Sequence, residues 1–301
     1  MKIALIIPYF GKWPKHFNLY LEGLSNNTFL DVIFFTDCDC SNIIFPSNAH
    51  IHYYTFENIL SLVKTKLGYS LEIQNTYKLC DFKPAYGKIF EDYLVSYEYW
   101  GYGDIDLIYG DLEKFIMPRI EKGFSILSSR NEIMSGSFSL FKNEVNIASL
   151  FNKIPDFEKN LATNEYISMD ETCFDEVTWK GGKKEDLNPN CFTFVVNQQV
   201  AEAVSFETIC VEKLIEGDLL EKKNTKLYFN GKEIAYFHYV CNKSDIKFFF
   251  RYWNKCPSSF YINYTGFYLS KNNLKLKTTF RLSVAFLIRA FNKVLKTPKS
   301  V

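Results

Sequence analysis

The sequence predicts an α/β fold in which helices flank a mixed, mostly parallel sheet and the C-terminus adds a helical appendage. Two short apolar runs near the N-terminus are typical of strands that are buried on both faces, and a helical pattern joins them. Later in the chain, apolar runs are separated by short polar segments, which is typical of antiparallel strands joined in hairpins. With 301 residues, of which 47% are hydrophobic, the chain is long enough for a large core.

The first elements predict a βαβ unit. Residues 3–7 form an aliphatic run that ends at Pro8, and residues 31–36 repeat this pattern before Asp37. Between the two runs, apolar residues recur at helical spacing: Phe17, Tyr20, Leu21 and Leu24. Strand, helix and strand in this order predict two parallel neighbours in one sheet.

Later elements complete the predicted sheet. A helix is expected to begin at Pro84, a residue favoured in a first turn, and to lead the chain to Trp100. Its apolar positions recur at intervals of three or four: Ile89, Phe90, Tyr93, Leu94 and Tyr97. Strands are expected at 124–129, 136–141, 192–197 and 233–240.

Charge and cysteine content limit the classes of function. A formal net charge of +1 argues against a nucleic-acid binder, which usually has a strong basic excess. The eight cysteines show no paired CxxC spacing, so we expect reduced thiols and a cytoplasmic protein. The apolar run at the N-terminus is too short for a signal peptide, and no run reaches the length of a membrane-spanning helix.

The composition changes after residue 245, which predicts a domain over residues 1–245 and an aromatic, basic appendage over 246–301. The end of the chain has the pattern of an amphipathic helix. Its apolar face would carry Phe280, Val284, Leu287, Phe291 and Val294, and its basic face Arg289, Lys293 and Lys296. Such a helix either packs on the domain or lies on an anionic membrane, here the inner face of the cytoplasmic membrane.

Two carboxylates follow a predicted strand in the segment WGYGDIDLIYGD. Asp104 and Asp106 would lie at the carboxyl end of that strand, where ligands collect in open α/β sheets. Two ionised carboxylates so close together repel each other unless a cation compensates. The pair therefore suits Mg²⁺ or Mn²⁺ carrying a diphosphate. The alternative is a turn role for Asp104 and a solvated Asp106.

Several segments together resemble the GT-A glycosyltransferases: PYF after the first strand, TD after the second, DFKPAYG, WGYGDIDLIYGD and SGSFSLF. Among these enzymes the chain is most similar to a bacterial group linked to capsule or lipopolysaccharide synthesis. The resemblance covers roughly residues 2–243 and implies a GT-A, Rossmann-like fold. It also implies that Asp104 and Asp106 hold the cation against the diphosphate of a nucleotide sugar.

The resemblance also implies which residues bind the nucleotide. Pro8, Tyr9 and Phe10 would contact the base, and Asp37 would lie near the uracil or the ribose. Lys83 would lie near the diphosphate or the ribose. The alternatives are core packing for the two aromatic residues, a turn role for Asp37 and a plain surface position for Lys83.

A late histidine completes the implied metal site. His238 would be the third ligand, and Lys243 would neutralise the leaving phosphate. The alternative for His238 is a hydrogen-bonded core position, and His16, His50 and His52 have no comparable context.

On the acceptor side, Asp170 or Glu171 at a predicted helix start would act as general base in an inverting reaction, or would cap that helix. Asp175 and Glu176 are second candidates. Ser135 and Gly136 would let the acceptor sugar approach the backbone, or would only allow tight packing.

These observations predict a metal-dependent glycosyltransferase of the hexosyltransferase type. It would move a sugar from a UDP-linked donor to a hydroxyl of a glycan or lipid-linked acceptor in bacterial surface polysaccharide synthesis. The alternatives are a sugar-nucleotide hydrolase or nucleotidyltransferase, and an inactive glycan-binding protein with the same fold.

Overall fold

The structure, a computed structural model, describes residues 1–173, 187–245, 247–250, 256–271, 274 and 278–286. The chain divides into two compact units. Unit 1 comprises Met1–Pro14, Leu24–Ile105 and Leu112–Ile209. Unit 2 comprises Lys15–Gly23, Asp106–Asp111 and Cys210–Val301.

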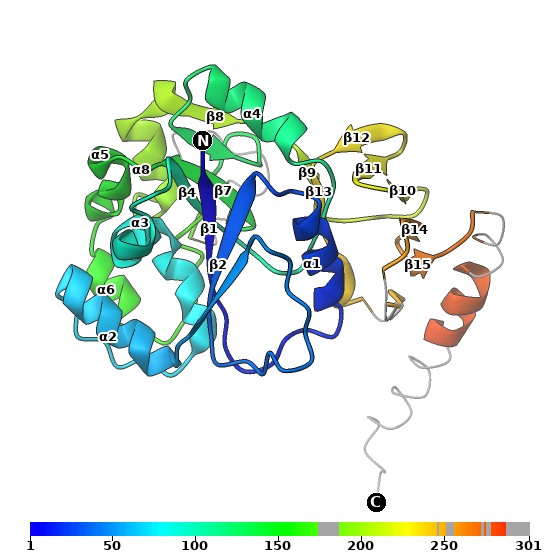
Figure 1. The fold of residues 1–301 in the computed structure, drawn as a ribbon, viewed down its shortest axis with the longest axis horizontal. Helices are drawn as coiled ribbons and strands as arrows, with labels where there is room; N and C mark the ends of the chain where they lie inside the picture. The colour runs from blue at the N-terminus through cyan, green and yellow to red at the C-terminus, as the bar shows by residue number, and fades with distance from the viewer. Residues whose placement is uncertain (174–186, 246, 251–255, 272–273, 275–277, 287–301) are drawn as a thin grey trace, which may run out of the picture. The chain divides into compact units, whose positions relative to one another are not determined.

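Unit 1 is built on a seven-stranded sheet with the order β3-β2-β1-β4-β7-β6-β8 (Figure 1). The strands are β1 (Ile3–Pro8), β2 (Leu30–Thr36), β3 (Ala49–Tyr53), β4 (Tyr99–Gly103), β6 (Ile126–Ser128), β7 (Phe138–Lys142) and β8 (Val204–Phe206). Only β7 runs antiparallel to its neighbours. The predicted mixed, mostly parallel sheet is therefore confirmed.

The predicted βαβ unit is also confirmed. Strands β1 and β2 pair in parallel from Ile3 opposite Leu30 to Pro8 opposite Phe35, and α1 (Phe17–Ser25) joins them along the chain. All but the last residue of β1 and all but one of β2 are buried, which explains their uninterrupted apolar runs.

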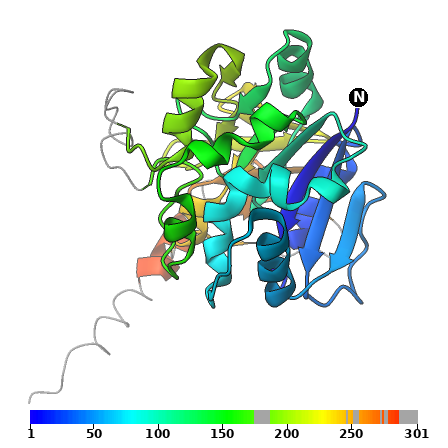
Figure 2. The same cartoon turned by 90° about the vertical axis from the view of Figure 1, so that its left-hand side faces the viewer.

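Helices cover one face of this sheet and form its main core (Figures 1 and 2). They are α2 (Phe56–Leu67), α3 (Tyr86–Ile89), α5 (Val145–Ala148), α6 (Phe157–Leu161) and α8 (Phe192–Gln199), with the 3₁₀ turns η1 (Thr76–Ala85) and η3 (Leu150–Lys153). Two further 3₁₀ turns, η2 (Glu91–Tyr93) and η5 (Ala201–Ala203), have no buried residues. Helix α4 (Glu113–Glu121) lies near β6 and β8, since Arg119 Nε donates to Ser205 Oγ at 2.8 Å. The predicted flanking helices are thus confirmed.

Two sequence predictions in unit 1 are corrected. The segment from Pro84 is not one long helix, since it is divided into the end of η1, the single turn of α3 and η2, and most residues of η1 and α3 are buried rather than those along one stripe. The run at 192–197 is helix α8, not a strand. Its buried positions repeat at helical spacing, and Cys191 caps it by accepting from Phe194 N.

Unit 2 contains a five-stranded antiparallel sheet with the order β12-β11-β10-β14-β15. Its strands are β10 (Leu220–Lys223), β11 (Lys226–Phe229), β12 (Lys232–Ile234), β14 (Ser259–Asn263) and β15 (Gly266–Tyr268). A smaller sheet joins β5 (Leu107–Tyr109), β13 (Tyr236–His238) and β9 (Cys210–Val211). The strand predicted at 233–240 is therefore split between two sheets and followed by α9 (Val240–Lys243).

Strands from both sides of residue 245 pair with each other, since β10 lies between β11 and β14. Residues 278–286 are helical, as predicted for the end of the chain. The positions Leu287, Arg289, Phe291, Lys293, Val294 and Lys296 of the predicted amphipathic helix lie outside the described residues. Within the described ranges, no helix has both the length and the apolar character needed to cross a bilayer.

Candidate active site

The parallel strands of unit 1 bring several predicted site residues to one edge of the sheet. Strands β2, β1 and β4 are neighbours that run in the same direction, so their carboxyl ends meet. Pro8 ends β1, Asp37 follows β2, and Asp104 follows β4. The backbone N–H of Asp104 donates to Ser137 O at 3.0 Å, which fixes this carboxylate beside the start of β7.

The loop after β1 carries the predicted nucleotide residues. Asp37 is exposed and accepts from Gly11 N at 2.7 Å, so it ties the two strand ends together. The half-buried ring of Tyr9 stacks on Trp13, with ring centroids 5.4 Å apart and an interplanar angle of 7°. Phe10 packs edge-on against Phe56. The base-binding roles stay predictions, and no sequence pattern marked Trp13 as a neighbour of this loop.

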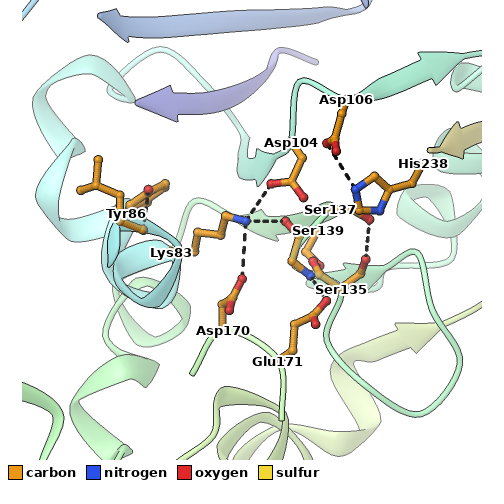
Figure 3. A network of polar contacts seen from close by, with 12 residues as sticks. Lys83, Tyr86, Asp104, Asp106, Ser135, Ser137, Ser139, Asp170, Glu171 and His238 are labelled. Carbon is orange, nitrogen blue, oxygen red and sulfur yellow. Dashed lines mark hydrogen bonds and ion pairs between the residues drawn. The ribbon is translucent and has the colours of Figure 1, made fainter. Parts of the chain in front are cut away.

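Lys83 is the centre of a buried polar cluster in unit 1 (Figure 3). Its Nζ donates to Asp104 Oδ1 at 2.9 Å and to Gly136 O at 2.8 Å, and lies 3.5 Å from Asp170 Oδ2. Burial by itself lowers the pKa of Lys83, but the neighbouring acids, led by Asp104, raise this pKa well above its ordinary value. Lys83 is therefore a buried cation and not a surface lysine.

Asp170 and Glu171, the predicted general bases, lie in a turn beside this cluster. Asp170 is 1% exposed. Burial raises its pKa well above the ordinary value despite the opposing charge of Lys83. Glu171 accepts from Gly136 N at 2.7 Å and from Arg130 Nη1 at 3.4 Å. Their catalytic roles stay predictions, and Asp175 and Glu176 lie outside the described residues.

The two predicted acceptor residues differ in their surroundings. A Cβ atom on Gly136 would lie 2.5 Å from Asp170 Oδ2, so only glycine lets this backbone approach the acids. Ser135 is fully buried, its Oγ lies 3.0 Å from that of Ser137, and its backbone carbonyl accepts from Ser139 Oγ at 2.8 Å (Figure 3).

A second buried ion pair holds the segment that leads to Asp170. Lys78 and Asp81 form a salt bridge of 2.9 Å, and both side chains are fully buried. Asp81 also accepts from Ile167 N at 3.0 Å and from Met169 N at 2.8 Å. Asp81 thus stabilises the backbone immediately before Asp170.

In unit 2, Asp106 lies between two basic side chains. His238 Nε2 lies 3.2 Å from its Oδ1 (Figure 3), and Lys243 Nζ donates to its Oδ2 at 2.5 Å. Burial alone raises the pKa of Asp106, but His238 and Lys243 bring this pKa well below its ordinary value. The ladder between β5 and β13 sets this geometry, since His238 pairs with Leu107, the residue after Asp106.

Two further residues of unit 2, Glu212 and His16, lie near His238 and Asp106. His238 Nδ1 lies 3.8 Å from Glu212 Oε1. His16 stacks on Phe250 with ring centroids 4.5 Å apart, and burial lowers the pKa of His16 to about 4, against the opposing charge of Asp106. No sequence pattern marked His16, because only the fold brings it into the field of Asp106.

Asp104, Asp106 and His238 supply two carboxylates and one imidazole, a set of side chains that could hold a metal ion. Only Ile105 separates the two acids along the chain. Mostly oxygen ligands with a single nitrogen suit Mn²⁺ or Mg²⁺. The donor chemistry therefore fits the cation that the sequence predicts.

Comparisons with known proteins place the chain in a family. A family model described as "Family of unknown function (DUF6625)" matches residues 5–271. Among solved structures, the crystal structure of mouse xyloside xylosyltransferase 1 in its apo form is similar with a TM-score of 0.40 and 11% sequence identity, over 81% of this chain and 99% of that one. No curated protein matches the sequence. Because the family model spans most of its length, the chain belongs to the DUF6625 family.

Proposed function

We propose that the protein is a metal-dependent glycosyltransferase that transfers a sugar from a UDP-linked donor to a hydroxyl of a glycan or lipid-linked acceptor. The observation that carries this proposal is the pair of acids directly after β4. Asp104 meets Lys83 in unit 1, and Asp106 meets His238 and Lys243 in unit 2. Cations that gather around adjacent carboxylates at the end of a strand suit the recognition of a diphosphate.

Asp104, Asp106 and His238 would hold the cation, Mn²⁺ or Mg²⁺. When bound, such an ion supplies positive charge opposite the diphosphate leaving group. Lys243 would remain close to the departing phosphate, since its ammonium group already lies at Asp106. Pro8, Tyr9, Phe10 and Asp37 would bind the nucleoside at the same sheet edge as Asp104.

The acceptor would lie at Gly136 and Ser135. In an inverting reaction the base must be ionised, and the raised pKa of the buried Asp170 makes that carboxyl group harder to ionise, which favours Glu171 as the base. Release of Glu171 from Gly136 N and Arg130 would then accompany acceptor binding. In a retaining reaction no such base is needed.

We also propose that the protein is a hexosyltransferase. It would work in the cytoplasm, in the synthesis of bacterial surface polysaccharides. The cytoplasmic setting rests on the cysteine spacing of the sequence, which has no paired CxxC motif. The polysaccharide role rests on the resemblance of the DFKPAYG and WGYGDIDLIYGD segments to that group of enzymes.

The test is UDP binding measured by calorimetry with and without Mn²⁺. The double variant Asp104→Asn/Asp106→Asn is expected to lose metal-dependent UDP binding while keeping a cooperative thermal transition. Asp92→Asn is the matched control, because Asp92 is 68% exposed and forms a salt bridge with Lys66. Metal-dependent UDP binding by the double variant at the affinity of the unmodified protein would overturn the proposal.

A further inference from the structure

The basic charge of this protein is concentrated at its C-terminal end. Residues 246–301 contain 11 Lys and Arg and no Asp or Glu, whereas residues 1–245 contain the other 24 of the 35 basic residues and all 34 acidic ones. The near-zero net charge of the whole chain therefore hides two regions of opposite sign. A basic segment without acids is attracted to an anionic surface.

One face of the helix at 278–286 is anchored to the five-stranded sheet of unit 2. Arg281 donates to Thr265 O at 3.0 Å and to Phe267 O at 2.8 Å, and its guanidinium lies 4.2 Å from the centre of the Tyr268 ring. Ala285, one turn further along, is 2% exposed. These contacts determine which face of the helix turns away from the sheet.

The outward face carries two large apolar side chains. Phe280 is 69% exposed and Phe286 is 71% exposed, and among the described residues no other phenylalanine has an exposed side chain. Two large apolar side chains exposed on the same outward face are unfavourable in water, which makes this face a candidate interaction surface.

We propose that this face, named here the Phe280/Phe286 face, docks on the surface of an anionic lipid bilayer. The two phenyl rings would enter the boundary between headgroups and acyl chains, while the basic residues of 246–301 would be attracted to the acidic headgroups. The same face of a second copy of the chain is a poorer occupant, because two such basic regions would repel each other. A nucleic acid would satisfy the positive charge but would leave the apolar rings in water.

The test is co-sedimentation of the full-length protein with vesicles of phosphatidylcholine, alone or mixed with phosphatidylglycerol. Binding is expected only to the mixed vesicles and is expected to weaken as salt is added. Phe280→Ser/Phe286→Ser is expected to bind about tenfold more weakly, since apolar contact with the acyl region is lost. The thermal transition is expected to be unchanged, because both side chains are exposed.

The matched control is Ile44→Ser/Val145→Ser, which removes two apolar side chains that are 94% and 87% exposed in unit 1. This control is expected to bind mixed vesicles like the unmodified protein. Three results would overturn the proposal: no binding to mixed vesicles, equal loss in both double variants, or binding to a DNA duplex in place of vesicles. Because none of the substituted residues belongs to the proposed active site, UDP binding reports separately on the proposed function.

Discussion

Lys83 and Asp104 form a salt bridge of 2.9 Å in which the lysine is almost fully buried and the carboxylate is partly exposed. Asp104 is the residue directly after β4, and the ammonium group of Lys83 already lies at one of its carboxylate oxygens. The same Nζ bonds the carbonyl of Gly136, so Lys83 links the end of β4 to the start of β7.

We expect Lys83→Met to destabilise the protein by about 2 kcal/mol, because it removes the cation from a largely buried group of acids and leaves Gly136 O without this donor. Urea denaturation measures the change in the free energy of unfolding. Lys88→Met is the matched control, since Lys88 is 43% exposed and pairs with Glu91 at the surface. A loss no greater than that of the control would contradict a buried role for Lys83.

Asp170→Asn is expected to change how stability depends on pH. The folded-state pKa of Asp170 is raised, so its contribution to stability is complete below the ordinary carboxyl pKa and is lost as the pH rises toward the folded-state value. Asparagine cannot ionise. The variant should therefore gain stability relative to the unmodified protein as the pH rises from about 4 toward the raised folded-state pKa, as measured by urea denaturation. A constant difference across this range would show that Asp170 does not change its ionisation on folding.

His238→Gln is expected to weaken Mn²⁺ binding at least about tenfold, because it removes the only nitrogen ligand of the proposed site. Calorimetric titration with Mn²⁺ measures this affinity without any need for turnover. His50→Gln serves as the control, since His50 is 45% exposed and lies 3.5 Å from Asp31 in unit 1. Equal Mn²⁺ affinity in both variants would remove His238 from the site.

Gly136→Ala is expected to destabilise the protein by about 1–3 kcal/mol, because the new methyl group would meet Asp170 Oδ2 at 2.5 Å. Asp170→Ala in the Gly136→Ala background should recover part of this loss, since it removes the atom that clashes. A double-mutant cycle in thermal or urea unfolding measures the coupling. Strictly additive effects would mean that the two residues do not approach each other this closely.

Much of the sheet in unit 1 was predictable because its strands are buried on both faces. Such strands are continuous apolar runs, so the patterns at 3–7 and 31–36 match β1 and β2 closely. The run at 192–197 is also largely apolar yet forms α8, since a short apolar run also suits a helix buried against a sheet. Periodicity could not separate the two.

In the candidate site too, the sequence determined some features and only the tertiary structure decided the others. By itself, the sequence determined the βαβ start of the sheet and the placement of Asp104 directly after a strand. Only the tertiary structure decided that Lys83 is buried between Asp104 and Asp170, that Gly136 lies against those acids, and that His16 lies in the field of Asp106. The physical reason is that strand and helix patterns depend on neighbouring residues, whereas the charge state of a buried group depends on residues far away in the chain.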